Sequence, residues 1–145
     1  MMKQKILKFP RVGIGVLIFK NKKILLGKRK GSHGAGEYAF PGGHLEYMET
    51  IEGCAERETL EETGIKIKNI KFQFIANIRK YKPKHYLHVG VTANYKSGKV
   101  QIKEGDKIES WDWYNLNKLP KPLFEMAGMA IKSHKKNKIY FKERK

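Results

Sequence analysis

The sequence of 145 residues has a single cysteine and no long hydrophobic run. One cysteine, Cys54, excludes an internal disulfide and fits a reducing compartment, so we expect the protein in the cytoplasm. No segment approaches the roughly 20 apolar residues that span a membrane, and no membrane partner is expected. A basic leader precedes the short apolar run 12–19, but no small-residue cleavage site follows it. This pattern favours a strand over a signal peptide.

Acidic residues are also scarce: 14 Asp and Glu stand against 31 Lys and Arg, which gives a formal net charge of +17. Such a charge suggests nucleic acid as a partner. Only five of the basic residues are Arg, however, and recognition of phosphates and base edges favours the Arg fork. The Lys residues are spread along the whole chain rather than gathered in a patch. A nucleic-acid polymer is therefore not expected, although a basic surface would still attract a polyanionic substrate.

Half of the acidic residues lie in one stretch, residues 43–65, with the sequence GHLEYMETIEGCAERETLEETGI. Thr50 can cap a helix that runs to about Thr63, and Gly64 then supplies a left-handed stop. At 100° per residue, one side of this helix carries the apolar residues Ile51, Cys54 and Ala55. The stretch therefore predicts an amphipathic helix in the middle of the chain.

Carboxylates continue the apolar side of this helix. Glu58 and Glu62 extend the same stripe by one turn, and Glu61 lies beside them. Three carboxylates within about one turn repel one another, and a buried acidic cluster is costly unless a cation lies in it. Oxygen ligands of this kind suit Mg²⁺, with Mn²⁺ as a substitute. The alternative is a solvated acidic helix that binds no metal.

The spacing in this stretch resembles the Nudix box. The matching positions are Gly43, Glu49, Arg57, Glu58, Glu61, Glu62, Gly64 and Ile65. Average residue frequencies would match the pattern by chance on the order of 10⁻⁹ per start point. One position departs from it, because Thr59 stands where the family usually has an aliphatic residue. The resemblance implies an α/β fold, a three-layer α/β/α sandwich with a mixed central sheet, and the chain length indicates one domain, residues 1–145.

The rest of the chain is compatible with that fold. Alternation and turn residues predict strands at 12–19, 23–30, 38–43, 65–81, 85–95 and 111–114. A last helix is expected at about 124–134, with a basic and frayed tail after it. Because Leu60 is apolar on the side opposite Ile51, we expect the central helix to be covered on both faces, which would bury its acids.

The resemblance also implies catalytic and metal-binding roles. The metal ligands of MutT-like Nudix enzymes match Glu58, Glu61, Glu62 and the carbonyl of Gly42, and Glu58 and Glu61 are catalytic candidates. Glu104 matches a loop that supplies an additional catalytic carboxylate, with Asp106 and Glu109 as rivals for the general base. Arg57 and Glu49 match a pair that braces the loop before the helix.

Two further positions match substrate-binding residues of that branch. Arg29 lies where MutT-like enzymes hold an arginine near the phosphates, and a guanidinium can grip two oxygens at once. Phe124, with Leu123 and Met126 beside it, lies where the last helix borders the nucleobase. Trp111 and Trp113 are interpreted as sheet packing. Four of the histidines, His33, His85, His88 and His134, lack metal-ligand spacing and are treated as ordinary.

Flanking segments 28–32, 34–36, 40–46 and 109–113 resemble the MutT-type nucleotide triphosphate diphosphatases. This implies Mg²⁺-dependent hydrolysis of nucleoside triphosphates to the monophosphate and pyrophosphate, with sanitising of the nucleotide pool as one use. Two alternatives stay open: a hydrolase of nucleoside diphosphates linked to another group, as in ADP-ribose, and a non-catalytic nucleotide or RNA binder. The complete acidic motif disfavours the binder. The expected partner is the nucleotide, and a homodimer stays an open alternative.

Overall fold

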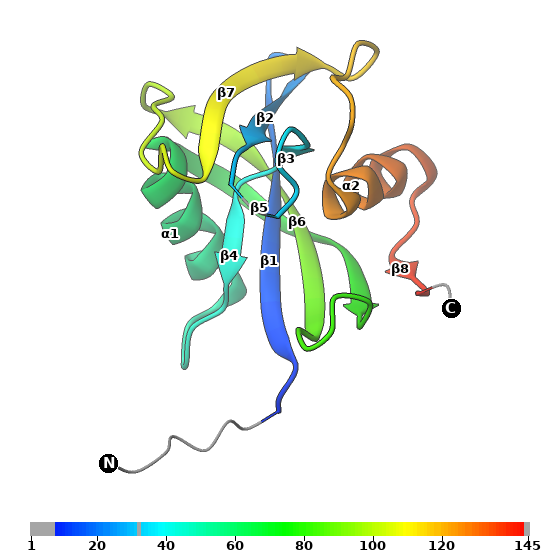
Figure 1. The fold of residues 1–145 in the computed structure, drawn as a ribbon. Helices are drawn as coiled ribbons and strands as arrows, with labels where there is room; N and C mark the ends of the chain where they lie inside the picture. Colours follow the sequence, from blue (N-terminus) through cyan, green and yellow to red (C-terminus); the bar gives the residue numbers. More distant parts are fainter. Residues whose placement is uncertain (1–7, 32, 144–145) are drawn as a thin grey trace.

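The computed structural model describes residues 8–31 and 33–143 (Figure 1). The elements are β1 (Arg11–Lys20), β2 (Lys23–Arg29), β3 (Tyr38–Ala39), β4 (Gly42–His44), α1 (Ile51–Thr63), β5 (Lys66–Ile78), β6 (Tyr86–Ser97), β7 (Ile108–Asn115), α2 (Glu125–Lys136) and β8 (Tyr140–Phe141). The predicted strands and both helices are present, with ends shifted by a few residues. Neither helix in this part of the chain has the length and apolar character required to span a membrane.

The strands form one mixed sheet in the order β3-β2-β1-β6-β5-β8, with β4 paired to β1 and β7 paired to β2. The pairs β1–β6 and β5–β8 are parallel, whereas β1–β2, β1–β4, β2–β7 and β5–β6 are antiparallel. The expected mixed central sheet is therefore confirmed.

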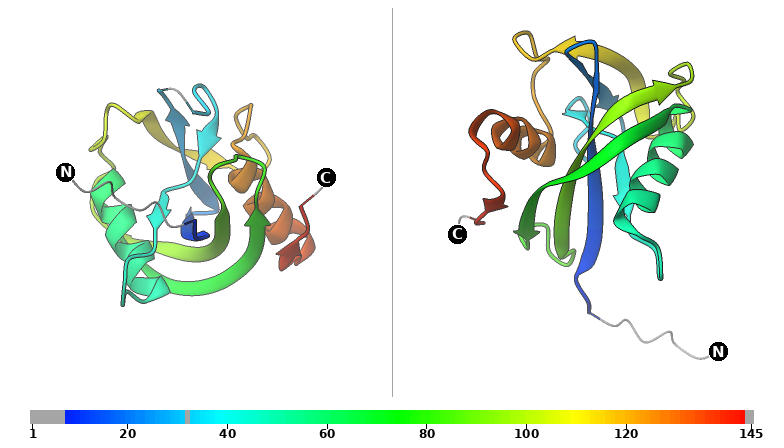
Figure 2. Two further views of the ribbon diagram at one scale, coloured as in Figure 1. Left: turned by 60° about the horizontal axis from the view of Figure 1, so that its bottom comes forward. Right: turned by 180° about the vertical axis from the view of Figure 1, so that it is seen from behind.

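The two helices lie on opposite sides of the sheet (Figures 1 and 2). On the α1 side, residues such as Ile14 and Val16 of β1 pack in a buried cluster with Cys54. On the α2 side, Leu17 of β1 packs in a second cluster with Ala130. Because successive strand residues point to opposite faces, β1 contributes to both cores. This arrangement is the predicted α/β/α sandwich.

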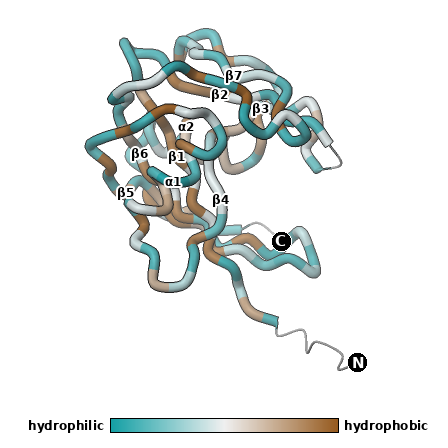
Figure 3. Tube along the Cα trace, turned by 90° about the vertical axis from the view of Figure 1, so that its left-hand side faces the viewer, coloured by the Kyte–Doolittle hydropathy of each residue, from teal (hydrophilic) through white to brown (hydrophobic). Residues whose placement is uncertain are grey.

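Helix α1 begins and ends where the sequence predicted. The Thr50 side chain accepts a hydrogen bond from Gly53 N at 2.9 Å, and Gly64, with φ of 78°, donates to Leu60 O. The expectation of cover on both faces is wrong, because the exposed fractions of Ile51 and Leu60 are 36% and 42%. α1 is the outer layer on its side of the sheet, as Figure 3 shows, so its outward face meets solvent.

The C-terminal segment is more ordered than the frayed tail expected from its charge. α2 continues to Lys136, and β8 then adds to the sheet beside β5. Ile75 N donates to Ile139 O at 2.9 Å, and Arg79 N donates to the Glu143 carboxylate at 2.7 Å. A two-residue strand has no periodicity of its own, so the local sequence carries no signal for it.

Candidate functional site

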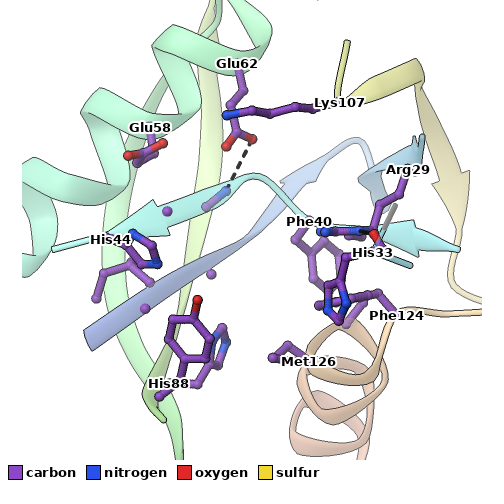
Figure 4. A pocket seen from close by; sticks show the side chains of 18 of the residues that line it. Arg29, His33, Phe40, His44, Glu58, Glu62, His88, Lys107, Phe124 and Met126 are labelled. Atoms are coloured by element: carbon purple, nitrogen blue, oxygen red, sulfur yellow. Dashed lines mark hydrogen bonds between the residues drawn. The ribbon is translucent and has the colours of Figure 1, made fainter. Parts of the chain in front are cut away.

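A cavity of about 1060 Å³ opens between α1, the β1–β4 pair and the start of α2 (Figure 4). Seven site residues predicted from the sequence line it: Arg29, Gly42, Glu58, Glu61, Glu62, Glu104 and Phe124. Asp106 lines it as well, whereas Glu109 and Leu123 are not among the lining residues. Positions that lie far apart in the sequence are thus brought to one place.

Two glycines of β4 leave room for close neighbours: Gly43 for the Glu58 carboxylate of α1, and Gly42 for the backbone of β1. Gly42 and Gly43 pair with Gly15 and Ile14 of β1. A Cβ atom on Gly43 would lie 2.2 Å from the Glu58 carboxyl carbon, and one on Gly42 would lie 2.1 Å from the Ile14 carbonyl oxygen. The clash at Gly42 is with backbone, so no side chain fits there, whereas at Gly43 the Glu58 carboxylate would have to move away.

Glu62 is the most strongly perturbed acid of the cavity. Burial raises the pKa of its carboxyl to about 8, and the nearby carboxylates Glu104 and Glu58 raise it further. Its Oε2 accepts a hydrogen bond from Gly42 N at 3.4 Å. Burial also raises the pKa of Glu58, although Arg57 opposes this. Because desolvated carboxylates crowd together here, the charged form of Glu62 requires a compensating cation.

Arg57 ties the loop before α1 to the helix. Its Nε and Nη2 donate to the two Glu49 carboxylate oxygens at 2.6 and 3.0 Å, and Nη2 also donates to His44 O at 3.1 Å. These bonds lower the pKa of Glu49 to about 2. Nη1 donates to Glu58 at 2.8 Å and to Glu61, half-exposed, at 3.3 Å. Arg57 therefore orients two of the candidate acids in addition to bracing the loop.

The donor set fits a hard divalent cation in its chemistry. Glu58 and Glu62 offer carboxylate oxygens in a desolvated place, with Glu104 near enough to raise the pKa of Glu62. Among residues 8–31 and 33–143, no three acidic, histidine or cysteine side chains already converge as a ligand shell. Mg²⁺ does not require such a cage, because it usually binds one or two carboxylates and completes its shell with water and substrate phosphates.

The other side of the cavity combines a cation with aromatic rings. The guanidinium carbon of Arg29 lies 4.2 Å from the centre of the Phe124 ring, so these two predicted substrate-binding residues contact each other. Arg29 Nε donates to His33 O at 3.2 Å. The His33 ring meets Phe124 and Tyr81 edge-on at 5.8 and 5.3 Å. Burial lowers the pKa of Arg29, with Glu37 opposing the shift.

Sequence reasoning missed three histidines that line the cavity: His33, His44 and His88. Lack of metal-ligand spacing says nothing about other roles of a histidine in a site. Burial lowers the pKa of His88 to about 4, which keeps its ring neutral. The ring lies beside Gly15, where a Cβ would approach it to 2.9 Å. The sequence signal that could have indicated this site is the pair Gly13 and Gly15, which leaves one face of β1 without side chains.

Comparison with known proteins finds one family model and several relatives that match most of the chain. The NUDIX domain model matches residues 9–132. An ADP-ribose pyrophosphatase of Methanocaldococcus jannaschii is 34% identical over 118 residues, covering 80% of this chain and 68% of that protein. An oxidized purine nucleoside triphosphate hydrolase of Danio rerio is 34% identical over 111 residues, covering 72% of this chain and 66% of that protein.

Among solved structures, the MutT NUDIX hydrolase from Burkholderia pseudomallei has a TM-score of 0.80 at 32% sequence identity, covering 86% of this chain and 97% of that one. The chain spans a smaller part of the NAD-capped RNA hydrolases NudC that it also matches. The chain is 32% identical to the NudC of Chromobacterium violaceum and covers 41% of the length of that protein.

Proposed function

The chain belongs to the Nudix family of pyrophosphohydrolases, which act on phosphoric anhydride bonds, and from that premise we propose that it hydrolyses nucleoside triphosphates. The products are the nucleoside monophosphate and pyrophosphate. The observation that carries this proposal is a single cavity with crowded carboxylates on one side and a cation over an aromatic ring on the other. The MutT relative and the triphosphate hydrolase of Danio rerio support this substrate class.

Four groups would hold the metal: the carboxylates of Glu58, Glu61 and Glu62 and the carbonyl of Gly42. Mg²⁺, or Mn²⁺ as a substitute, would neutralise phosphate charge and polarise the attacking water when bound. Arg57 positions Glu58 and Glu61 through the hydrogen bonds described above. Gly43 lets the Glu58 carboxylate lie against β4, and Gly42 N donates a hydrogen bond to Glu62.

Glu104 is the proposed general base. It accepts a proton from the attacking water while the water oxygen bonds to phosphorus and the bond from phosphorus to the bridging oxygen breaks. Lys107 Nζ lies 3.7 Å from its carboxylate, an ion pair within the same loop that helps to orient Glu104. Asp106 of the same loop lines the cavity and is the remaining rival for this role.

Arg29 and Phe124 are the proposed substrate contacts. The guanidinium would bind phosphate oxygens, and the aromatic ring would stack on the nucleobase. Stacking tolerates different bases, so this contact alone selects no particular one. Oxidised purine nucleotides are included among the proposed substrates because of the Danio rerio relative, which would make nucleotide-pool sanitising the biological use.

A second candidate is hydrolysis of a nucleoside diphosphate linked to another group. The ADP-ribose pyrophosphatase of Methanocaldococcus jannaschii, at 34% identity, is the observation in its favour. A release assay over a panel of nucleotides with Mg²⁺ separates the two. Triphosphates yield pyrophosphate directly, whereas linked diphosphates yield phosphate only after a phosphatase is added. Activity confined to linked diphosphates would overturn the triphosphate proposal.

A further inference from the structure

One end of the cavity carries two cations and an imidazole that have no role in the proposed reaction. Arg11, His44 and Lys84 are called the basic cluster below. They come from the start of β1, the end of β4 and the loop between β5 and β6. Arg11 N donates to His85 O at 2.8 Å, and Arg11 pairs with Tyr86 across the parallel strands. The sheet itself therefore brings these separate segments together.

Charge is unbalanced at this end. The pKa of His44 is lowered by burial and then by Arg11 and Lys84, so both cations act on the imidazole. Within the described part of the chain, neither Arg11 nor Lys84 forms an ion pair, whereas Arg57, Arg79 and Lys80 each do. Glu46, also in the cavity lining, is paired with Arg57 at 3.7 Å. Two cations that line the same cavity and lack a counter-ion in the described part of the chain favour an anion between them.

The basic cluster borders the acidic side of the cavity. His44 directly follows Gly43, which lies against the Glu58 carboxylate. In Figure 4, His44 lies on the side of Glu58, while Arg29 and Phe124 lie on the opposite side. A ligand with its reacting phosphate at the carboxylates could thus extend in two directions, toward Phe124 or toward the basic cluster.

We propose that the basic cluster binds the distal phosphates of the substrate, the part that leaves as pyrophosphate. This inference rests on the proposed function. An uncharged second moiety fits less well, because the rings of His44 and Tyr86 already stack on each other, at 5.6 Å and 16°. Arg and Lys suit the polyanionic end of a triphosphate, and each charge-assisted hydrogen bond favours it over a neutral group.

The direct test is the binding of inorganic pyrophosphate to the full chain, measured by calorimetry in EDTA so that bound metal contributes nothing. The test variant is Arg11→Gln/Lys84→Gln. Its matched control is Lys68→Gln/Lys118→Gln, which removes the same charge at exposed positions outside the cavity lining. We expect affinity to fall at least about tenfold in the test variant, since two charge-assisted contacts are lost. The control should stay within about twofold of the wild type.

Kinetics supply a second readout. In the test variant, the KM for a nucleoside triphosphate should rise by about tenfold, while inhibition by the nucleoside monophosphate, which lacks distal phosphates, should not change. Equal loss of pyrophosphate affinity in test and control variants, or loss of monophosphate affinity alone, would overturn the proposal. If the protein binds pyrophosphate through the basic cluster but hydrolyses no triphosphate, the proposed function is refuted while the anion-binding site is supported.

Discussion

At the residue scale, Thr59 shows what one departure from the Nudix box does to the helix. The side chain is fully buried, and its hydroxyl has no hydrogen-bond partner. An unsatisfied buried hydroxyl costs about 1–3 kcal/mol. We expect Thr59→Val, which keeps the shape and removes the hydroxyl, to raise the free energy of unfolding by about 1–2 kcal/mol. Urea unfolding monitored by circular dichroism measures this change.

Thr63 is the matched control for that substitution, since it is buried on the same helix but its hydroxyl is satisfied. It donates to Thr59 O at 2.6 Å and accepts from Ile65 N at 3.3 Å. Thr63→Val should therefore lower the free energy of unfolding by about 1 kcal/mol. A loss of stability in Thr59→Val as well would show that its hydroxyl has a partner after all.

Glu62 is a second residue for which the effect on folding stability and the effect on turnover can be measured separately. Glu62→Gln removes a proposed metal ligand but no core packing, so turnover should fall at least about a hundredfold with the fold retained. Glu56→Gln, on the exposed side of the same helix, is the control and should keep its turnover. Steady-state pyrophosphate release at saturating Mg²⁺ measures both variants. Near-normal turnover in Glu62→Gln would mean that α1 does not hold the metal.

The raised pKa of Glu62 also predicts how metal-free stability depends on pH. The folded state holds the Glu62 proton up to about pH 8, whereas the ordinary value is 4.5. The folded state therefore binds more protons between these values, and stability must fall as pH rises through them. In EDTA, the melting temperature of Glu62→Gln should exceed that of the wild type more at about pH 8 than at about pH 5. A gap that does not change with pH would contradict the assignment.

At the scale of elements, β4 and α1 can approach each other closely because Gly43 has no side chain. Gly43→Ala would place a Cβ at 2.2 Å from the Glu58 carboxyl carbon, so Glu58 must move. We expect a large loss of turnover, with the far-ultraviolet circular dichroism spectrum unchanged. Gly128→Ala in α2 is the control, because nothing lies within 4 Å of the added Cβ. It should retain activity and raise the free energy of unfolding by about 1 kcal/mol, from helix propensity.

The elements also show which features the sequence could predict. The ends of α1 depend on local chemistry, the Thr50 cap and the Gly64 stop, and both were predicted. The acids that share the cavity follow from the helical period and the box. Exposure of Ile51 and Leu60 depends on what packs outside the helix, which no local pattern records. The same holds for His88, because only the pairing of β6 with β1 brings it beside Gly13 and Gly15.

At the scale of the whole molecule, the basic and the acidic residues have different roles. The excess of basic residues gives a net charge of +17, while the acids concentrate along α1 beside the cavity. A positive surface around a negative centre attracts a polyanionic nucleotide from a distance and favours a cation at the centre. The long-range attraction weakens over a Debye length of about 10 Å at 0.1 M salt, whereas short, partly buried contacts are screened much less.

This division predicts different salt dependences for substrate capture and for turnover. Added salt should raise the KM for nucleoside triphosphates while the turnover number at saturation hardly changes, because screening acts on the encounter and not on contacts within the cavity. An RNA-binding protein would behave differently: its polymer affinity would fall steeply with salt, with a logarithmic slope set by the phosphates contacted. Both quantities can be measured in one salt series, using steady-state kinetics and titration with RNA of arbitrary sequence. We expect weak RNA binding at about 0.15 M salt together with clear hydrolysis of free triphosphates. Tight RNA binding that persists at about 0.2 M salt, without pyrophosphate release from any nucleotide, would identify a binder on this fold instead.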